Sequence, residues 1–440
     1  MKTEHVSTTQ DAVWKNETGA LQSTSRAAGL TVGERTDQTW MGWGGCFNEL
    51  GWRALGMLDQ DVRDGVLKDL FEPEGGCRFT LCRLPIGAND YSLNWYSLNE
   101  FDGDFSMERF SIDRDRNDLI PYIKTAKRLC PDLKLFASPW SPPTWMKKPA
   151  VNNFGSFIMK EEYLRAYALY FLKFVQAYKA EGLPIAQVHV QNEPVSSQKF
   201  PSCIWSGEQL KVFIRDYLGP LFKEQGLDTE IWLGTINGPE TDNRFLTTTF
   251  NHYANLVLDD EVAGRYIKGV GYQWAGKYAM QRTRQAWPDL PLMQTENECG
   301  DGRNTWDYAF YVFDLFYHYI VNGAAGYIYW NMVLQSGGES SWGWKQNSMF
   351  TVDPAARTVT RTPEYYIMKH FSHFIRPGAK RLQLEGRWSA NAVAFRQGKS
   401  TILVVRNPFR EARQLDIGIG GSTFARDLPP VSVNTIVLAE

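Results

Sequence analysis

The stretch Gln187-Val-His-Val-Gln-Asn-Glu-Pro194 is a short apolar-rich strand that ends in a carboxylate and is closed by a proline, which cannot extend strand pairing. Further along the chain, Pro291-Leu-Met-Gln-Thr-Glu296 repeats this design. Cleavage of a glycosidic bond needs two such carboxyl groups, one as proton donor and one as nucleophile or base. A (β/α)8 barrel places its catalytic groups at strand ends of this kind. The pair therefore predicts an α/β barrel that acts on sugars.

Short strand-like runs alternate with longer amphipathic runs along most of the chain, which is typical of βα units around a parallel sheet. Helical spacing of apolar residues is clearest in 59–70, 161–180 and 307–322. Eight strands that are each followed by a helix indicate a TIM barrel. The eight predicted strands are 41–47, 78–83, 134–138, 187–191, 230–235, 269–273, 292–296 and 326–330.

From about residue 377 the chain changes to short β runs separated by turn residues. Such an antiparallel module needs partner strands, and residues 1–40 can supply one or two of them. We therefore expect a barrel over 41–376, with an attached antiparallel β side domain formed by 377–440 and part of 1–40. The predicted strands of the tail are 382–384, 392–396, 400–406, 414–417 and 431–437.

Composition argues against several classes of function. The 47 basic and 49 acidic residues nearly balance, which gives no indication of binding to nucleic acid or to an anionic membrane. The chain has no metal-binding histidine motif, no phosphate-binding glycine motif and no GxSxG motif, and the pair His370 and His373 is expected to be structural. We therefore expect no metal and no cofactor. No apolar run is long enough for an integral membrane segment.

The six cysteines are scattered and contain no CxxC pair, which favours reduced, buried thiols over a disulfide framework. Residues 1–10 are polar and lack the apolar core of a signal peptide. We therefore expect a cytoplasmic protein, or a secreted one if a signal peptide has been removed. The sequence gives no indication of the oligomeric state.

Aromatic residues make up 14% of the chain, and several tryptophans lie beside Gly, Pro and polar residues in predicted loops. Such a side chain can stack on a sugar ring or can simply be buried, and the sequence leaves both interpretations open. The residues concerned are Trp43, Trp95, Trp140, Trp145, Trp342 and Trp344. The segment 136–147 contains two of them among three prolines, which predicts a rigid aromatic wall.

Glu193 and Glu296 are the predicted catalytic pair. Glu298 competes with Glu296 because residues i and i+2 share a strand face, but the apolar strand ends at Glu296. Arg83 ends the second strand, and an inward arginine would keep a nearby carboxylate ionised, as a nucleophile requires. Asn192 could donate a hydrogen bond to a sugar 2-hydroxyl. Asp90 could bind a pair of sugar hydroxyls or could cap a turn.

The chain resembles glycoside hydrolase family 30, which includes the glucosylceramidases, over essentially its whole length. The resemblance is carried by Phe-Ala-Ser-Pro-Trp-Ser-Pro-Pro-Thr-Trp-Met-Lys at 136–147, Arg-Leu-Pro-Ile-Gly-Ala-Asn-Asp-Tyr-Ser at 83–92, Gln-Asn-Glu-Pro at 191–194 and Tyr-Trp-Asn at 329–331. It implies a barrel with a β side domain and retaining double displacement, with Glu193 as acid/base and Glu296 as nucleophile. It also implies the pocket residues Arg83, Asp90, Trp140, Asn192 and Trp330.

Two positions depart from the glucosylceramidase-like members, which carry Asp where this chain has Glu49 and His where it has Gln273. Both positions are expected near the sugar, and with Trp274 they complete the predicted substrate-binding set. We expect a retaining β-glycosidase that is β-glucosidase-like or glucosylceramidase-like, with β-1,6-linked glucosides among its candidate substrates. The alternatives are an endo-acting β-1,6-glucanase, β-1,6-galactanase or xylanase of the same family. Outside the enzymes, the alternative is a catalytically silent carbohydrate-binding barrel.

Overall fold

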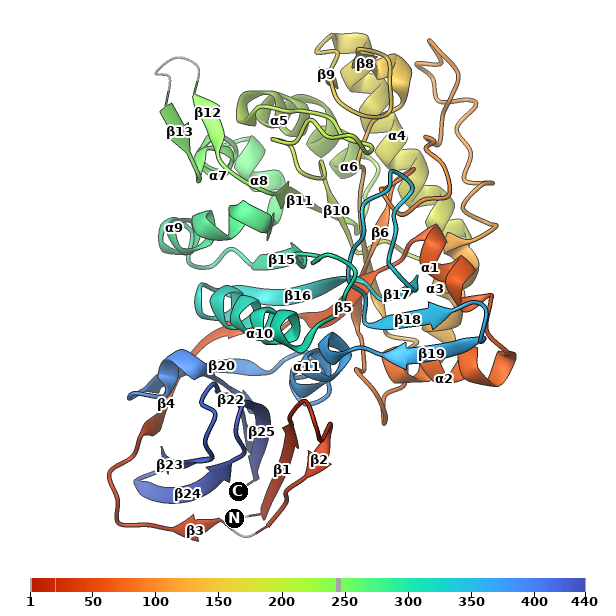
Figure 1. Ribbon diagram of the computed structural model, residues 1–440. Coiled ribbons are helices and arrows are strands. Elements are labelled where there is room, and N and C mark those ends of the chain that lie inside the picture. Colours follow the sequence, from red (N-terminus) through yellow and green to blue (C-terminus); the bar gives the residue numbers. More distant parts are fainter. Residues whose placement is uncertain (1, 20, 243–246, 440) are drawn as a thin grey trace.

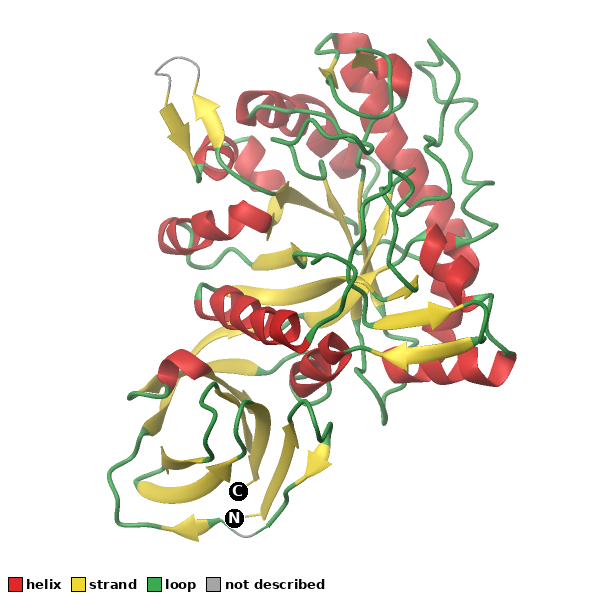
Figure 2. Ribbon diagram, in the orientation of Figure 1, coloured by secondary structure: helices red, strands yellow, loops and turns green. Residues whose placement is uncertain are grey.

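The computed structural model describes residues 2–19, 21–242 and 247–439. Eight parallel strands form a closed barrel, and helices cover its outside (Figures 1 and 2). This confirms the predicted (β/α)8 fold. In chain order the barrel strands are β5 (Gly42–Cys46), β6 (Leu81–Pro85), β7 (Lys134–Ser138), β10 (Gln187–His189), β11 (Glu230–Ile236), β14 (Ile267–Gln273), β15 (Leu292–Glu296) and β16 (Ala324–Asn331).

The helices follow the barrel strands and bury their apolar faces against them. In α10, the Thr305 hydroxyl caps the first turn by accepting from the Tyr308 amide at 3.2 Å, and Phe313 and Phe316 are buried. The three predicted helices correspond to α2, α4 and α10. The helices are α1 (Glu49–Leu55), α2 (Gln60–Phe71), α3 (Leu119–Leu129), α4 (Glu161–Ala180), α5 (Gly207–Phe213), α6 (Gly219–Glu224), α7 (His252–Leu258), α8 (Ala263–Tyr266), α9 (Met280–Ala286), α10 (Trp306–Val321) and α11 (Pro363–Ser372).

An apolar cluster fills the lower part of the barrel. Its five buried members, which we call the floor layer, are Leu81, Phe136, Trp232, Met293 and Ile328. Because side chains alternate along a strand, the residue two positions after a floor residue faces the same interior one level higher. The barrel therefore has room for a second layer at the carboxyl ends of its strands.

The side domain is one ten-stranded sheet with its own apolar core, and it contains strands from both ends of the chain (Figure 1). All its neighbouring strands pair antiparallel except β23 and β4. The sheet order is β2 (Lys15–Asn16), β1 (Lys2–Thr8), β25 (Ser432–Ala439), β22 (Ser400–Asn407), β21 (Ala392–Gln397), β20 (Lys380–Glu385), β4 (Leu30–Thr39), β23 (Arg413–Ile419), β24 (Ser422–Leu428) and β3 (Gln22–Ser23).

The N-terminal segment contributes four strands rather than the one or two expected, and β24 was not predicted. The two-residue strands β2 and β3 are exposed and therefore have no apolar pattern. β24 is mostly half-buried or exposed, so alternation of apolar residues does not reveal it either. The ring of His370 joins α11 to this sheet, because its nitrogens lie 2.8 Å from the hydroxyls of Thr8 and Thr435. This contact gives His370 a structural role, as expected.

Three small sheets lie in loops that follow the carboxyl ends of barrel strands. They are the hairpin of β8 (Lys147–Lys148) with β9 (Ser156–Phe157), the hairpin of β12 (Glu240–Asp242) with β13 (Thr247–Thr249), and the sheet of β17 (Val333–Gln335), β18 (Phe350–Asp353) and β19 (Thr358–Arg361). All six cysteines are buried and unpaired. Within the described ranges, no helix is long and apolar enough to cross a membrane. The same residues contain no His, Cys, Asp and Glu cluster suited to a metal ion.

Candidate active site

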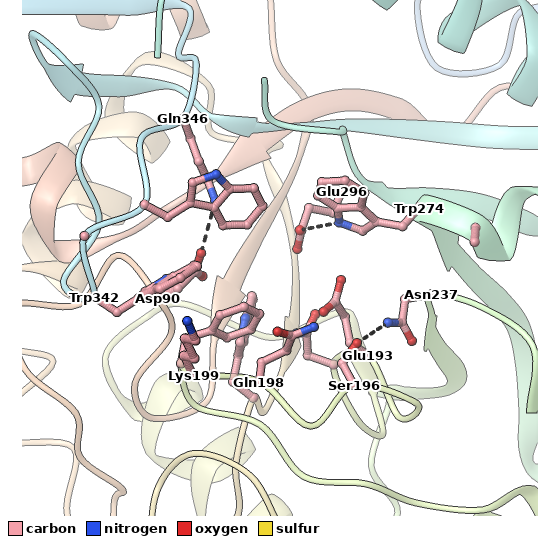
Figure 3. A pocket seen from close by; sticks show the side chains of 16 residues that line it. Asp90, Glu193, Ser196, Gln198, Lys199, Asn237, Trp274, Glu296, Trp342 and Gln346 are labelled. Carbon is pink, nitrogen blue, oxygen red and sulfur yellow. Dashed lines mark hydrogen bonds between the residues drawn. The ribbon is translucent and has the colours of Figure 1, made fainter. Parts of the chain in front are cut away.

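A cavity of about 640 Å³ lies at the carboxyl ends of the barrel strands, a volume typical of small-ligand sites. Glu193, just beyond β10, and Glu296, the last residue of β15, both face it (Figure 3). Each is 7% exposed. Six of the ten predicted site residues line the cavity, namely Asp90, Trp140, Asn192, Glu193, Trp274 and Glu296.

Glu296 is held by two donors. Arg83 Nη1 donates to its Oε2 at 2.8 Å, and the indole nitrogen of Trp274 donates to its Oε1 at 3.2 Å. Arg83 is fully buried and stacks over the Trp140 ring at 4.3 Å. Burial raises the pKa of Glu296, whereas the Arg83 charge and the Trp274 hydrogen bond oppose that rise. The ion pair with Arg83 therefore favours the ionised form of Glu296.

Glu193 has a different environment. Its Oε1 accepts from the amide nitrogen of Gln273 at 3.1 Å, and no cation within the described residues forms an ion pair with it. Burial and the neighbouring charge of Glu296 raise the pKa of Glu193 to about 8. Its backbone has φ +50°, in the left-handed region that side chains rarely adopt, and such strain is typical of functional sites. The two carboxyls therefore ionise in sequence, Glu296 first, which suits one acid and one nucleophile.

Arg83 also orients Asn192. Its Nη2 donates to Asn192 Oδ1 at 2.6 Å and to the Ser138 hydroxyl at 2.8 Å, and the Thr235 hydroxyl donates to the same Asn192 oxygen at 3.0 Å. The Asn192 oxygen is thus fully used, and Asn192 lines the cavity. Its amide nitrogen is therefore the atom that remains to meet a ligand.

Gln273 was predicted to bind substrate, and the structure corrects this. Its side chain is fully buried, and its oxygen accepts from Thr295 Oγ1 at 2.8 Å and from Arg83 Nη1 at 3.2 Å. Its nitrogen donates to Glu193 and to Asn192 Oδ1. Because protein groups occupy both ends of the amide, Gln273 holds Glu193 in place rather than facing a sugar.

Glu49 was also expected near the sugar, and the structure places it elsewhere. Its carboxylate accepts from the Leu93 amide at 2.6 Å and pairs with Arg114 at 3.1 Å, beside a separate depression. The preceding residue, Asn48, caps α1 and donates to Asn331 Oδ1 at 3.0 Å. The chain turns into α1 at this point, so the side chain of Glu49 leaves the barrel interior.

Trp330 and Asp90 have distinct places. Trp330 is 1% exposed, stacks behind Trp140 at 5.6 Å and donates to Gln346 Oε1 at 2.8 Å, so it supports the wall without lining the cavity. Asp90 lines the cavity, and its Oδ1 is buried with no hydrogen-bond partner in the part of the chain that the structure describes. Burial raises the pKa of Asp90 well above its usual range. The Asp90 carboxyl is thus placed to meet a ligand hydroxyl.

Glu298, the rival to Glu296, does not face the cavity. Its carboxylate pairs with Lys277 at 2.6 Å and accepts from the Tyr311 hydroxyl at 2.6 Å. Because β15 ends at Glu296, the alternation of strand faces no longer applies two residues further on.

Several cavity residues were not predicted from the sequence. Asn237 directly follows β11, so its position at a strand end was an available indication. Gln346 and the segment 198–200 lie in long loops that carry no such pattern. Of the six loop tryptophans considered, only Trp140, Trp342 and Trp344 line the cavity.

Comparison with known proteins identifies the family. Residues 40–375 match the model of the glycosyl hydrolase family 30 TIM-barrel domain. The chain belongs to this family. The predicted family and enzyme class are thereby confirmed, and the chain is a family 30 glycoside hydrolase.

Relatives of this family 30 hydrolase have two kinds of name. Putative glucosylceramidase 1 of Caenorhabditis elegans is 29% identical over 365 residues, which are 78% of this chain and 68% of the relative. Lysosomal acid glucosylceramidase of Mus musculus is 26% identical over 446 residues, which cover 94% of this chain and 84% of the relative. An endo-1,6-beta-D-glucanase of Neurospora crassa is 27% identical over 406 residues, which cover 84% of this chain and 79% of the relative.

Solved structures share the whole fold of the family 30 hydrolase. SrfJ from Salmonella typhimurium superposes with a TM-score of 0.91 at 26% identity, covering all of both chains. The endo-beta1,6-glucanase BT3312 also covers all of both chains, with a TM-score of 0.89 at 24% identity. The latter likeness shows the fold alone.

Proposed function

We propose that this family 30 hydrolase is a retaining β-glucosidase, with Glu296 as nucleophile and Glu193 as acid/base. The observation that carries the proposal is the unequal environment of two buried carboxyls on one cavity. Arg83 is paired with Glu296, while Glu193 has neutral hydrogen-bond donors and a pKa raised to about 8. This difference supplies an ionised nucleophile and a protonated acid at neutral pH.

In the first step, Glu296 attacks the anomeric carbon while Glu193 gives its proton to the leaving oxygen, so the glycosidic bond breaks and a glycosyl ester forms. The ester removes the negative charge of Glu296. Because that charge helps to raise the pKa of Glu193, its loss lowers this pKa and turns Glu193 into a base. In the second step, Glu193 takes a proton from water, whose oxygen attacks the anomeric carbon and releases Glu296 as a carboxylate.

Three cavity residues are suited to the sugar. The amide nitrogen of Asn192 can donate to the 2-hydroxyl, the unpartnered Asp90 oxygen can accept from ring hydroxyls, and Trp140 offers an apolar wall. The loop after β17 forms a wall of the cavity beside Asp90, because Ser341 N and Oγ both donate to the Asp90 carbonyl, at 3.2 and 3.0 Å, and Trp342 and Trp344 line the cavity. A wall beside the bound sugar supports cleavage of a terminal residue.

A second candidate function is endo-1,6-β-glucanase activity. It is favoured by the similarity to the fungal endo-1,6-beta-D-glucanase and by the extension of the cavity past Glu193 along residues 198–200 to Trp342. The similarity to glucosylceramidases supports glucose as the sugar in either case.

A panel of nitrophenyl β-glycosides tests the proposal with the wild type, Glu193→Gln and Glu296→Gln. We expect the glucoside to be cleaved fastest, with glucose released first in the β-configuration by NMR. Glu296→Gln should lose activity on every substrate. Glu193→Gln should still form the glycosyl ester from a dinitrophenyl glucoside, whose leaving group needs no acid. The residue roles are wrong if both variants turn over like the wild type.

The same proteins decide between the two candidate functions. Glucosylceramide and a β-1,6-linked glucan are offered separately, and the products are sized over time. Release of glucose alone supports terminal cleavage. Early appearance of glucan fragments supports the endo alternative.

A further inference from the structure

Lys147 is a buried cation that no acidic side chain among the described residues neutralises. It lies at the start of β8, in the loop between β7 and α4, and is 2% exposed. Its ammonium donates to Ser141 Oγ at 2.9 Å and to three backbone carbonyls, those of Val151 at 2.8 Å, Asn152 at 2.9 Å and Ser202 at 2.6 Å. Burial of an unpaired charge is costly, so this set of oxygens must hold the ammonium closely.

The four oxygens belong to three separate segments around the cavity. Ser141 follows Trp140, Val151 and Asn152 form the turn between β8 and β9, and Ser202 lies in the loop between β10 and α5. A Lys147 ammonium thus cross-links loops that follow two neighbouring barrel strands.

Ser202 carries this contact to the cavity wall. Its hydroxyl accepts from the amides of Phe154 and Gln198, both at 3.0 Å, and its amide donates to the Asn152 carbonyl at 3.1 Å. Gln198, with its neighbours at 199 and 200, lines the cavity. The ring centroids of Phe200 and Trp342 lie 5.6 Å apart, so this wall contacts the loop after β17.

This wall lies on the same side as Glu193. Figure 3 shows Glu193, Ser196, Gln198 and Lys199 along one side of the cavity, with Glu296 on the other. Under the proposed function, Glu193 protonates the leaving oxygen. The wall at 198–200 therefore faces the leaving group rather than the sugar that becomes the ester.

We propose that Lys147 is a positioning residue for the leaving-group side of the site, whose buried ammonium fixes the wall at 198–200 through Ser202. The proposal rests on the proposed function for the identity of that side. It predicts that Lys147 affects substrates with a bulky leaving group and spares those with a minimal one.

The geometry also gives the wall a pH dependence. Burial lowers the pKa of Lys147 to about 8, so the ammonium loses a proton, and with it a donor, as the pH rises through that value. Within the part of the chain that the structure describes, the titratable group that interacts with it is the Cys203 thiol, whose pKa burial raises to about 12. Cys203 therefore stays neutral over the same range and does not replace the lost charge.

The test compares a β-1,6-linked glucose disaccharide with β-glucosyl fluoride, whose leaving group is a single atom. The measured quantity is the ratio of their kcat/KM values, in which any titration that affects both substrates alike cancels. Lys147→Met should lower this ratio about tenfold or more, because misplacement of the wall costs only the bulky leaving group. Lys148→Met, in the exposed neighbour on the same strand, should leave the ratio unchanged.

In the wild type the ratio should fall above pH 8, in part because Glu193 also loses its proton there. The fall should be smaller in Lys147→Arg, which stays charged. An equal loss on both substrates in Lys147→Met would mean that Lys147 only supports the fold. A fall of the same size in the wild type and in Lys147→Arg would also overturn the proposal.

Hydrogen exchange separates this inference from the proposed function. Peptides covering 148–157 and 195–205 should lose protection in Lys147→Met, while the peptide covering β7 should not. If neither substrate is cleaved by the wild type, the proposed function fails and exchange still decides the Lys147 contact. If Lys147→Met leaves the protection of both peptides unchanged, the proposed role of Lys147 is wrong.

Discussion

The floor layer and the polar layer at the carboxyl ends of the barrel strands have opposite character. In β6, Leu81 belongs to the floor and Arg83 lies above it, and in β7 Phe136 lies below Ser138. The floor is apolar and closely packed, with the His189 ring between Phe136 at 4.8 Å and Trp232 at 5.3 Å. It buries apolar surface and so stabilises the barrel.

The upper layer, which we call the catalytic layer, consists of Arg83, Asn192, Glu193, Gln273 and Glu296. It holds three ionisable groups away from water, joined by hydrogen bonds of 2.6 to 3.3 Å. Buried charges cost folding free energy that such bonds only partly offset. The barrel therefore presents a stabilising level inside its strands and a chemically active level at their carboxyl ends.

Among substitutions that separate the two layers, Arg83→Met in the catalytic layer should have the largest effect on activity. Glu296 would lose its only ion-pair partner among the described residues, and its pKa would rise. We expect kcat/KM on nitrophenyl β-glucoside to fall about 10³-fold, as for loss of a key electrostatic donor. Arg114→Met is the matched control, because Arg114 pairs with Glu49 outside the cavity. A loss as large in the control would contradict the assignment.

Phe136→Ala should lower stability and leave catalysis largely intact, because Phe136 belongs to the floor layer. Loss of a buried ring should lower the free energy of unfolding by about 3 kcal/mol, from lost burial and the cavity left behind. The kcat of the protein that remains folded should stay within a fewfold range. Urea denaturation and active-site titration measure the two quantities. Unchanged stability with lost activity would show that the two layers are not separable.

Glu193→Gln should stabilise the protein at alkaline pH. The folded-state pKa of Glu193 is about 8, against a usual value of 4.5, so between these values the folded state binds a proton that the unfolded state does not. The contribution of Glu193 to stability therefore falls as the pH rises from about 4.5 to 8.

The glutamine has no such titration, and the gain at pH 8 should be on the order of 1 to 3 kcal/mol and smaller at pH 5. Denaturation at both pH values measures it. Glu161→Gln, on the exposed face of α4, serves as control. Parallel pH profiles for wild type and Glu193→Gln would refute this account.

The smallest effect is expected in Trp274→Phe, which removes one neutral donor to Glu296. A single hydrogen bond is worth about 1 kcal/mol, so kcat/KM should fall about fivefold. The pKa of Glu296 should rise, which moves the acidic limb of the pH profile to higher pH. Tyr311→Phe, which removes a donor to Glu298 outside the cavity, should leave the profile in place.

Local sequence pattern predicted the barrel well because its strands are short apolar runs, several of which end in a polar residue. All eight predicted strands overlap a barrel strand, and the polar ends of β10 and β15 meet at one cavity. The direction of single side chains was harder to predict. Glu49 and Gln273 lie at or just after strand ends, as the catalytic pair does. Glu49 nevertheless turns into α1, and Gln273 bonds to its neighbours.

Residues in long loops gave no local indication of their roles. Lys147 is surrounded by oxygens from segments as distant as Ser202, and no pattern near position 147 encodes that contact. The strands β1 to β4 were underestimated for the same reason. The partners of β1, β3 and β4 lie at the other end of the chain, so their pairing appears only in three dimensions.

This pairing sets an order of events during synthesis. β4 pairs with β20 and β23, and β1 pairs with β25, so these ladders join residues before 40 with residues after 379. Barrel strands β5 and β16 can meet earlier. At ribosomal rates of about 5 to 20 residues per second, β4 waits about 17 to 70 seconds for β20. During that time its unpaired edge is open to other chains, so this segment, which is made before the barrel, completes its pairing after the barrel has been made.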